Sequence, residues 1–173
     1  MNEDGSGRSR QMADESTEEL LARLDRTVLY APEQDMWVRF EDDGLATIGA
    51  THLVAHHGQF MLFSPRPVGM TVARDRSLGV METAKTAVAV HAPLSCEIVQ
   101  VNPAVLVDVS VIEREPYAAG WMFRVRPTLL AEERASLLDA DAYAQWLAPR
   151  LAEKLTPPID YSGDIDIDPM RGW

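Results

Sequence analysis

The residues with the clearest capacity for chemistry are Glu82 and Lys85, within the sequence Gly-Val-Met-Glu-Thr-Ala-Lys-Thr-Ala at residues 79–87. The stretch lies between two apolar, β-rich segments, which predicts Lys85 at or near the tip of a β-hairpin. The 16 basic residues comprise 14 arginines and two lysines, Lys85 and Lys154. A lysine amine can be acylated, whereas a guanidinium normally is not, so Lys85 is a candidate for covalent modification. The alternative is an ordinary soluble turn in which Glu82 forms a weak surface ion pair with Lys85.

Other groups are weaker candidates. His52 and His56 would share a face if residues 51–57 are helical, as paired metal ligands do, but no third ligand is evident and ordinary polar surface residues are expected. Cys96, the one cysteine, has no adjacent histidine and is predicted to be a small packing residue. The aspartates near the C-terminus lack the glycine and final glutamate of a calcium loop; they are Asp160, Asp164, Asp166 and Asp168. Walker, Gly-x-Gly-x-x-Gly, Gly-x-Ser-x-Gly and Cys-x-x-Cys motifs are absent from the sequence, so a stand-alone enzyme has little support.

Short strands must position the hairpin. An Asp-Asp-Gly turn at residues 42–44 predicts a β-hairpin of residues 37–41 and 45–49. More strands are predicted at residues 59–63, 70–73, 77–82, 88–92, 97–101, 107–112 and 121–126. Helical spacing predicts a short helix over residues 17–26 with its N-cap at Ser16 or Thr17, and helices over residues 129–138 and 140–155, the latter capped by Asp139. Many short strands with regular turns predict a mainly β sandwich or barrel.

The composition is that of one globular domain with tails: 173 residues, 46% hydrophobic and 25% charged. The net charge of −11 argues against a broad nucleic-acid or membrane surface. A single cysteine and an N-terminus without a basic-then-apolar order predict a soluble, cytoplasmic protein. We expect a flexible acidic arm and short helix at residues 1–27, a central domain at 28–155, and an extended acidic tail at 156–173.

Residues 79–87 resemble the lipoyl-lysine hairpin of the glycine cleavage system H protein family, whose pattern is Gly-Val-x-Glu-Ser-x-Lys-Ala, and Glu82 and Lys85 match it in identity and spacing. Further blocks resemble the same family in the same order. They are Tyr30-Ala31 with Trp37-Val38, Ile48-Gly49-Ala50-Thr51, residues 92–102 (Ala-Pro-Leu-Ser-Cys-Glu-Ile-Val-Gln-Val-Asn), residues 115–122 (Glu-Pro-Tyr-Ala-Ala-Gly-Trp-Met), and residues 138–143, which resemble the family's closing helix. The resemblance spans about residues 28–150.

The resemblance implies a barrel-sandwich hybrid, a flattened β-barrel with the lipoyl hairpin at one end and helices at the other. It implies a non-catalytic carrier with lipoate attached to Lys85 and with Glu82 recognised by the lipoate-attaching enzyme. Such a carrier accepts an aminomethyl group at glycine decarboxylase, passes it to an aminomethyltransferase and is reoxidised by dihydrolipoyl dehydrogenase. Lys154, on the last helix, would remain unmodified, and a monomer is expected.

Several positions depart from the family pattern. Asp35-Met36 replaces His-Glu, Cys96 replaces a glycine, and the acid-rich segment before the hairpin is altered at residues 58–67. Two alternatives therefore stay open: an H-like lipoate-binding protein of sulfur oxidation with heterodisulfide-reductase-like partners, and an unlipoylated binding module. The aromatic residues are expected in the core rather than in a groove that shelters the loaded arm; they are Trp37, Phe60, Phe63, Tyr117 and Trp121.

Overall fold

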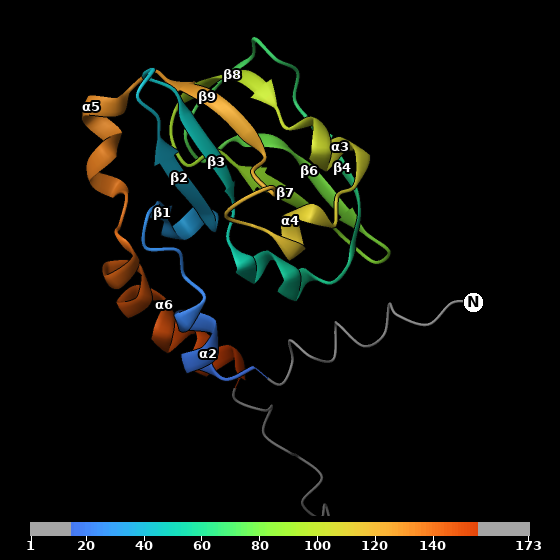
Figure 1. Ribbon diagram of the computed structural model, residues 1–173, viewed down its shortest axis with the longest axis vertical. Helices are drawn as coiled ribbons and strands as arrows, with labels where there is room; N and C mark the ends of the chain where they lie inside the picture. The colour runs from blue at the N-terminus through green and yellow to red at the C-terminus, as the bar shows by residue number, and fades with distance from the viewer. Residues whose placement is uncertain (1–14, 156–173) are drawn as a thin grey trace, which may run out of the picture.

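Antiparallel strands form two sheets in the computed structural model, which describes residues 15–155 (Figure 1). The larger sheet has the order β1–β2–β3–β9–β8–β5. Its strands are β1 (Leu29–Ala31), β2 (Met36–Phe40), β3 (Ala46–Ala50), β5 (Thr71–Val72), β8 (Cys96–Val101) and β9 (Phe123–Pro127). The smaller sheet has the order β4–β6–β7, with β4 (Phe60–Pro65), β6 (Ser77–Thr83) and β7 (Ala87–His91). The predicted acidic tail and residues 1–14 of the predicted arm lie outside the described residues.

One hydrophobic core joins the two sheets. Val38, Ile48 and Phe123 reach it from the larger sheet, while Phe63 and Met81 reach it from the smaller one. Phe63 and Phe123 meet edge to face, with ring centroids 5.7 Å apart. The pairings among the described strands leave both sheets open, so the architecture is the predicted mainly β sandwich and not a closed barrel.

The turn chemistry confirms the first predicted hairpin and corrects one strand. Gly44 has φ +81°, the left-handed conformation that the tight β2–β3 turn requires. Residues 107–112, predicted as a strand, instead cover the end of α3 (Pro103–Val107), a turn at residues 108–110 and the start of α4 (Val111–Arg114). The cause is local: the side chain of Asn102 accepts a hydrogen bond from Ala104 N, and Pro103 occupies the first helical turn, so capping prevails over β-branched composition.

The remaining helices follow the predictions in place and differ in length. α2 (Thr17–Ala22) begins at the N-cap Ser16, whose capping box with Glu19 is complete, and ends four residues earlier than predicted. The predicted helix 129–138 is divided into α5 (Leu130–Glu133) and a 3₁₀ turn, η3 (Arg134–Ser136), and it ends before Leu138, which pairs with Tyr30 of β1. α6 (Ala140–Leu155) is capped by Asp139, whose carboxylate accepts from Ala142 N at 2.8 Å. Short 3₁₀ helices, η1 (Pro32–Gln34) and η2 (His52–His57), complete the described elements.

A second hydrophobic cluster fixes the helices against the sheets. α2 lies beside α6 (Figure 1), and Leu20 and Leu24 of this N-terminal segment pack with Tyr30, Trp37 and Tyr143. The rings of Tyr30 and Tyr143 stack with centroids 4.4 Å apart. Within residues 15–155, none of the helices is long and apolar enough to cross a membrane.

Candidate functional site

The hairpin of β6 and β7 carries Lys85 at its tip. The strands pair from Ser77↔His91 to Glu82↔Ala87, which leaves residues 83–86 to make the turn. Figure 1 shows this turn projecting at the side of the molecule away from α5 and α6. Lys85 is exposed, and its amine takes part in none of the hydrogen bonds or ion pairs found among the described residues. The predicted position of Lys85 is therefore confirmed, and its amine is accessible.

Thr83 organises the turn. Its hydroxyl accepts hydrogen bonds from the backbone N–H of Lys85 at 3.2 Å and of Thr86 at 3.1 Å. Thr83 N also donates to Thr86 O at 2.8 Å and closes the turn. These bonds hold the Lys85 backbone while its side chain stays free. Thr83 is not among the residues predicted from the sequence, although a hydroxyl residue at the start of a turn is a recognisable signal.

Gly79 allows the hairpin to lie close to β4. A Cβ at this position would lie 2.6 Å from Ser64 O and 2.8 Å from Pro65 Cα, both of which are backbone atoms. On the next inward-facing row, Phe63, Met81 and Val88 face the core. The glycine of the hairpin motif is thus required for strand contact, and the buried row beneath it makes the support rigid.

Glu82 lies on the opposite, solvent side of the hairpin. Its backbone pairs with Leu62 on β4 and with Ala87 on β7, so its carboxylate stands on the exposed face. No ion pair joins Glu82 to Lys85 in the described part of the chain, and the carboxylate has no hydrogen-bond donor there. The alternative explanation for Glu82, a surface ion pair with Lys85 in an ordinary turn, is therefore not seen among the described residues.

The other motif residues build the scaffold. Trp37 is fully buried and its indole N–H donates to Pro116 O at 2.9 Å. Gly49 faces that indole, and a Cβ there would lie 2.7 Å from the ring. Phe60 and Phe63 are buried as predicted, whereas Tyr117 and Trp121 are partly buried against the second cluster. These residues shape the domain and lie outside the hairpin chemistry.

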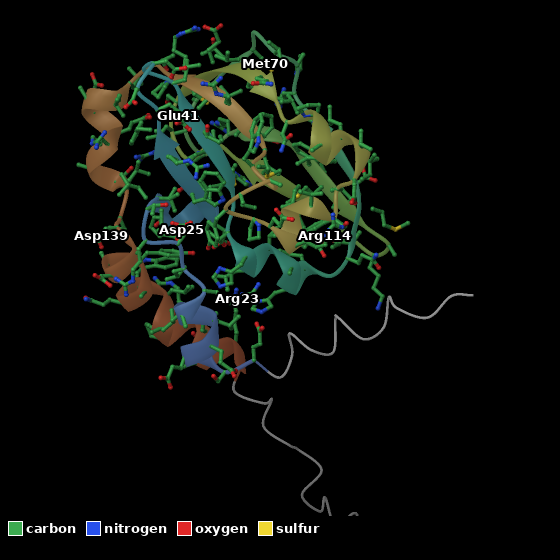
Figure 2. All side chains as sticks on the ribbon, viewed as in Figure 1. Arg23, Asp25, Glu41, Met70, Arg114 and Asp139 are labelled. Atoms are coloured by element: carbon green, nitrogen blue, oxygen red, sulfur yellow. The ribbon has the colours of Figure 1, made fainter. Side chains whose placement is uncertain are left out.

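His52 is a core residue and not the polar surface residue that was predicted. Only 1% of its surface is exposed, its Nε2 lies 2.9 Å from Leu20 O, and its Nδ1 lies 2.8 Å from the hydroxyl of Tyr117. Because a carbonyl can only accept, Nε2 carries the proton and Nδ1 accepts from Tyr117. Burial lowers the pKa of His52 to about 4. Arg23, labelled in Figure 2 at the end of α2, adds to this lowering.

The other weak candidates form no metal or thiol site within residues 15–155. His56 is four residues from His52, but η2 is a 3₁₀ helix, in which side chains three apart align, so the two imidazoles diverge. No cluster of three metal-binding side chains occurs within the described ranges. Cys96 is fully buried in the core, and burial raises its thiol pKa to about 12, which confirms a packing role. The aspartates of the tail lie outside the described residues.

Comparison with known proteins agrees with this geometry. The family model described as "Glycine cleavage H-protein" matches residues 28–150. The chain belongs to the glycine cleavage H-protein family. It is 42% identical over 108 residues to the "Glycine cleavage system H protein" of Psychrobacter sp. (strain PRwf-1), an alignment that covers 62% of this chain and 85% of the relative. It is 33% identical over 133 residues to "Glycine cleavage system H protein 5" of Aquifex aeolicus, which covers 75% of this chain and 89% of the relative.

A solved structure supports the same membership. The crystal structure of a glycine cleavage system H protein from Mycobacterium marinum superposes with a TM-score of 0.63 at 31% identity, covering 71% of this chain and 98% of the other. H proteins are lipoyl carriers and not catalysts, so family membership supports the prediction of a carrier protein. These comparisons give no support to the sulfur-oxidation alternative. α2 lies outside the residues that match the family model.

Proposed function

We propose that this protein is a lipoyl carrier in which Lys85 is the attachment site and Glu82 is recognised by the attaching enzyme. The observation that carries the proposal is the exposed amine of Lys85, which has no partner among residues 15–155, at the tip of a hairpin whose backbone is held by Thr83. Membership of the glycine cleavage H-protein family supports it.

The residues present fit covalent attachment of lipoate. Attachment requires the unprotonated Nζ of Lys85 to attack the carbonyl of an activated lipoyl donor, an acyl adenylate. The amide N–C bond forms, the bond to the adenylate breaks, and Nζ loses a proton to solvent. Lys85 meets the steric requirement because its side chain is exposed and its amine is not engaged in an ion pair among the described residues.

The rigid hairpin allows the carrier to present its lipoyl arm to partner enzymes. When attached, lipoate supplies a dithiolane that accepts an aminomethyl fragment by reductive transfer and is afterwards reoxidised from the dithiol. The proposed partners are glycine decarboxylase, an aminomethyltransferase and dihydrolipoyl dehydrogenase. The protein's own contribution is to hold the arm at a projecting tip, above the buried row of Phe63, Met81 and Val88, so that the arm can reach several enzymes in turn.

Mass spectrometry tests the proposal directly. The full chain is incubated with a lipoate–protein ligase, lipoate and ATP, and the intact protein and its peptides are weighed. One lipoyl adduct on Lys85 is expected, with none on Lys85→Arg. Lys154→Arg is the matched control, because it removes the other lysine from the end of α6 and leaves the hairpin intact. An unmodified wild-type chain, under conditions that load a known H protein, would favour an unlipoylated binding module.

A further inference from the structure

The first residue of β4 lies directly opposite the residue that organises the lysine-bearing turn. Phe60 pairs with Thr83, and the register then shifts between Phe60 and Leu62, so Met61 is an extra residue that forms a β-bulge. The Phe60–Thr83 pair is thus the last β4–β6 pair before the turn, and the bulge separates it from the regular ladder. The N–H of Thr83 is used across the turn, where it donates to Thr86 O. β4 therefore supports the turn through this one pair, which depends on how Phe60 is held.

Phe60 is held by its side chain and by its backbone. The residue is 2% exposed, and its ring is buried in the core between the two sheets. Its backbone N–H donates to a carboxylate oxygen of Glu113 at 3.0 Å. Because the acceptor is a carboxylate in a partly buried site, this hydrogen bond is stronger than one between neutral groups. Glu113 and Phe60 are 53 residues apart, so the bond joins α4 to the start of β4.

α4 is a fixed support for Glu113, although it has only four residues. Ile112 is fully buried and packs into the core. The next residue after Glu113 is Arg114, labelled in Figure 2, which forms an ion pair with Asp108 at 3.0 Å. A Cβ on Gly120 would lie 2.9 Å from Ile112 Cα, so the loop that follows α4 packs directly against the helix backbone. The carboxylate of Glu113 is therefore presented to β4 from a rigid position.

We infer that Glu113 is a positioning residue for lipoylation, because it fixes the start of β4 and thereby the turn that presents Lys85. This inference rests on the proposed function. Glu113 accepts from Phe60 N, and Phe60 lies opposite Thr83. The hydroxyl of Thr83 in turn accepts from Lys85 N at 3.2 Å. Removing the carboxylate would leave the N–H of Phe60 without this acceptor, which favours movement of the β4 start. The turn would then adopt the conformation needed for acylation for only part of the time.

Hydrogen exchange of the full, unmodified chain, followed by NMR, tests the positioning directly. In Glu113→Ala the protection of the Phe60 amide should fall about tenfold, and the Lys85 and Thr86 amides should also lose protection. Glu113→Gln should stay near wild type, because its side-chain oxygen can accept the same bond. Glu113→Asp should resemble Glu113→Ala, because its carboxylate is one methylene shorter. Glu115→Ala is the matched control: Glu115 is exposed, and its side chain makes none of the hydrogen bonds or ion pairs found within residues 15–155.

The kinetics of a lipoate–protein ligase on the same variants give the second readout. When the competent conformation of the turn is populated about one fifth of the time, the apparent affinity falls by the same factor. In Glu113→Ala, KM should therefore rise about fivefold with little change in kcat, while Glu113→Gln and Glu115→Ala keep the wild-type KM. A general loss of stability that leaves the turn intact would not raise KM in this way.

The outcomes separate this inference from the proposed function. Wild-type exchange at residues 85 and 86 in Glu113→Ala would overturn the inference. Loss of protection in Glu113→Gln would also overturn it, since the effect would then arise from charge. A higher KM without faster exchange would overturn it in favour of direct contact between Glu113 and the enzyme. If Glu113→Ala does not fold, Glu113→Asp supplies the same comparison. A wild-type chain that accepts no lipoate would overturn the proposed function, while the exchange data would still decide the role of Glu113.

Discussion

Acid should weaken the native state through His52, in a pH range where carboxylates contribute little. In the folded protein the imidazole is enclosed, with Leu20 O and the Tyr117 hydroxyl as its partners. The neutral ring satisfies both, whereas a protonated ring would place a second N–H against a hydroxyl in a buried site. Unfolding exposes the imidazole to water. At mildly acidic pH the His52 ring is therefore protonated in the unfolded chain but stays neutral in the native protein.

The magnitude follows from the two pKa values of His52. The pKa is 6.5 for the ordinary imidazole and about 4 in the folded protein. Because the native pKa is the lower one, the free energy of unfolding falls as the pH drops from about 6.5 toward 4. Between pH 7.5 and pH 5 the loss is about 2 kcal/mol, at roughly 1.4 kcal/mol per pKa unit. Such a loss is a large share of the stability of a small domain.

Urea unfolding of wild type and His52→Gln at several pH values between 5 and 7.5 measures this effect. Glutamine can donate to Leu20 O and accept from Tyr117 but does not titrate, so its unfolding free energy should depend much less on pH. His56 and Asp35, whose pKa values are also displaced by burial, titrate in both proteins and cancel in the difference. Equal pH slopes for the two proteins would refute the burial of His52 beneath α2.

Three further predictions concern the site and its support. Gly79→Ala should destabilise the fold by about 1–3 kcal/mol in urea unfolding and slow lipoylation, because the added methyl group meets the backbone of β4; unchanged stability would contradict the close strand contact. Thr83→Val should leave global stability nearly unchanged but increase hydrogen exchange at the amides of residues 85 and 86, and wild-type exchange there would contradict the role of its hydroxyl. Asp139→Ala should cost about 1 kcal/mol by removing the cap of α6, whereas Asp139→Asn should restore most of it in the same urea assay.

Local signals in the sequence were sufficient for much of the fold. The Asp-Asp-Gly turn, the Ser16 cap and the Asp139 cap each act within a few residues, and the structure confirms all three. Where two local signals competed, the prediction failed. Residues 107–112 have β-branched composition, yet Asn102 and Pro103 start a helix just before them. The tip position of Lys85 was predictable because a hairpin is itself a local structure.

Long-range contacts decided the rest. The sequence alone determined a mainly β domain, a hairpin lysine and a likeness to the H-protein family. Only the tertiary structure placed His52 beside Leu20 and Tyr117, which are 32 and 65 residues away. It also set Leu62 beside Glu82, because the neighbour of a strand residue depends on pairing register and on the bulge in β4. Residue types therefore indicate the chemistry, while register and packing decide which surface a partner meets, since these depend on contacts between distant parts of the chain.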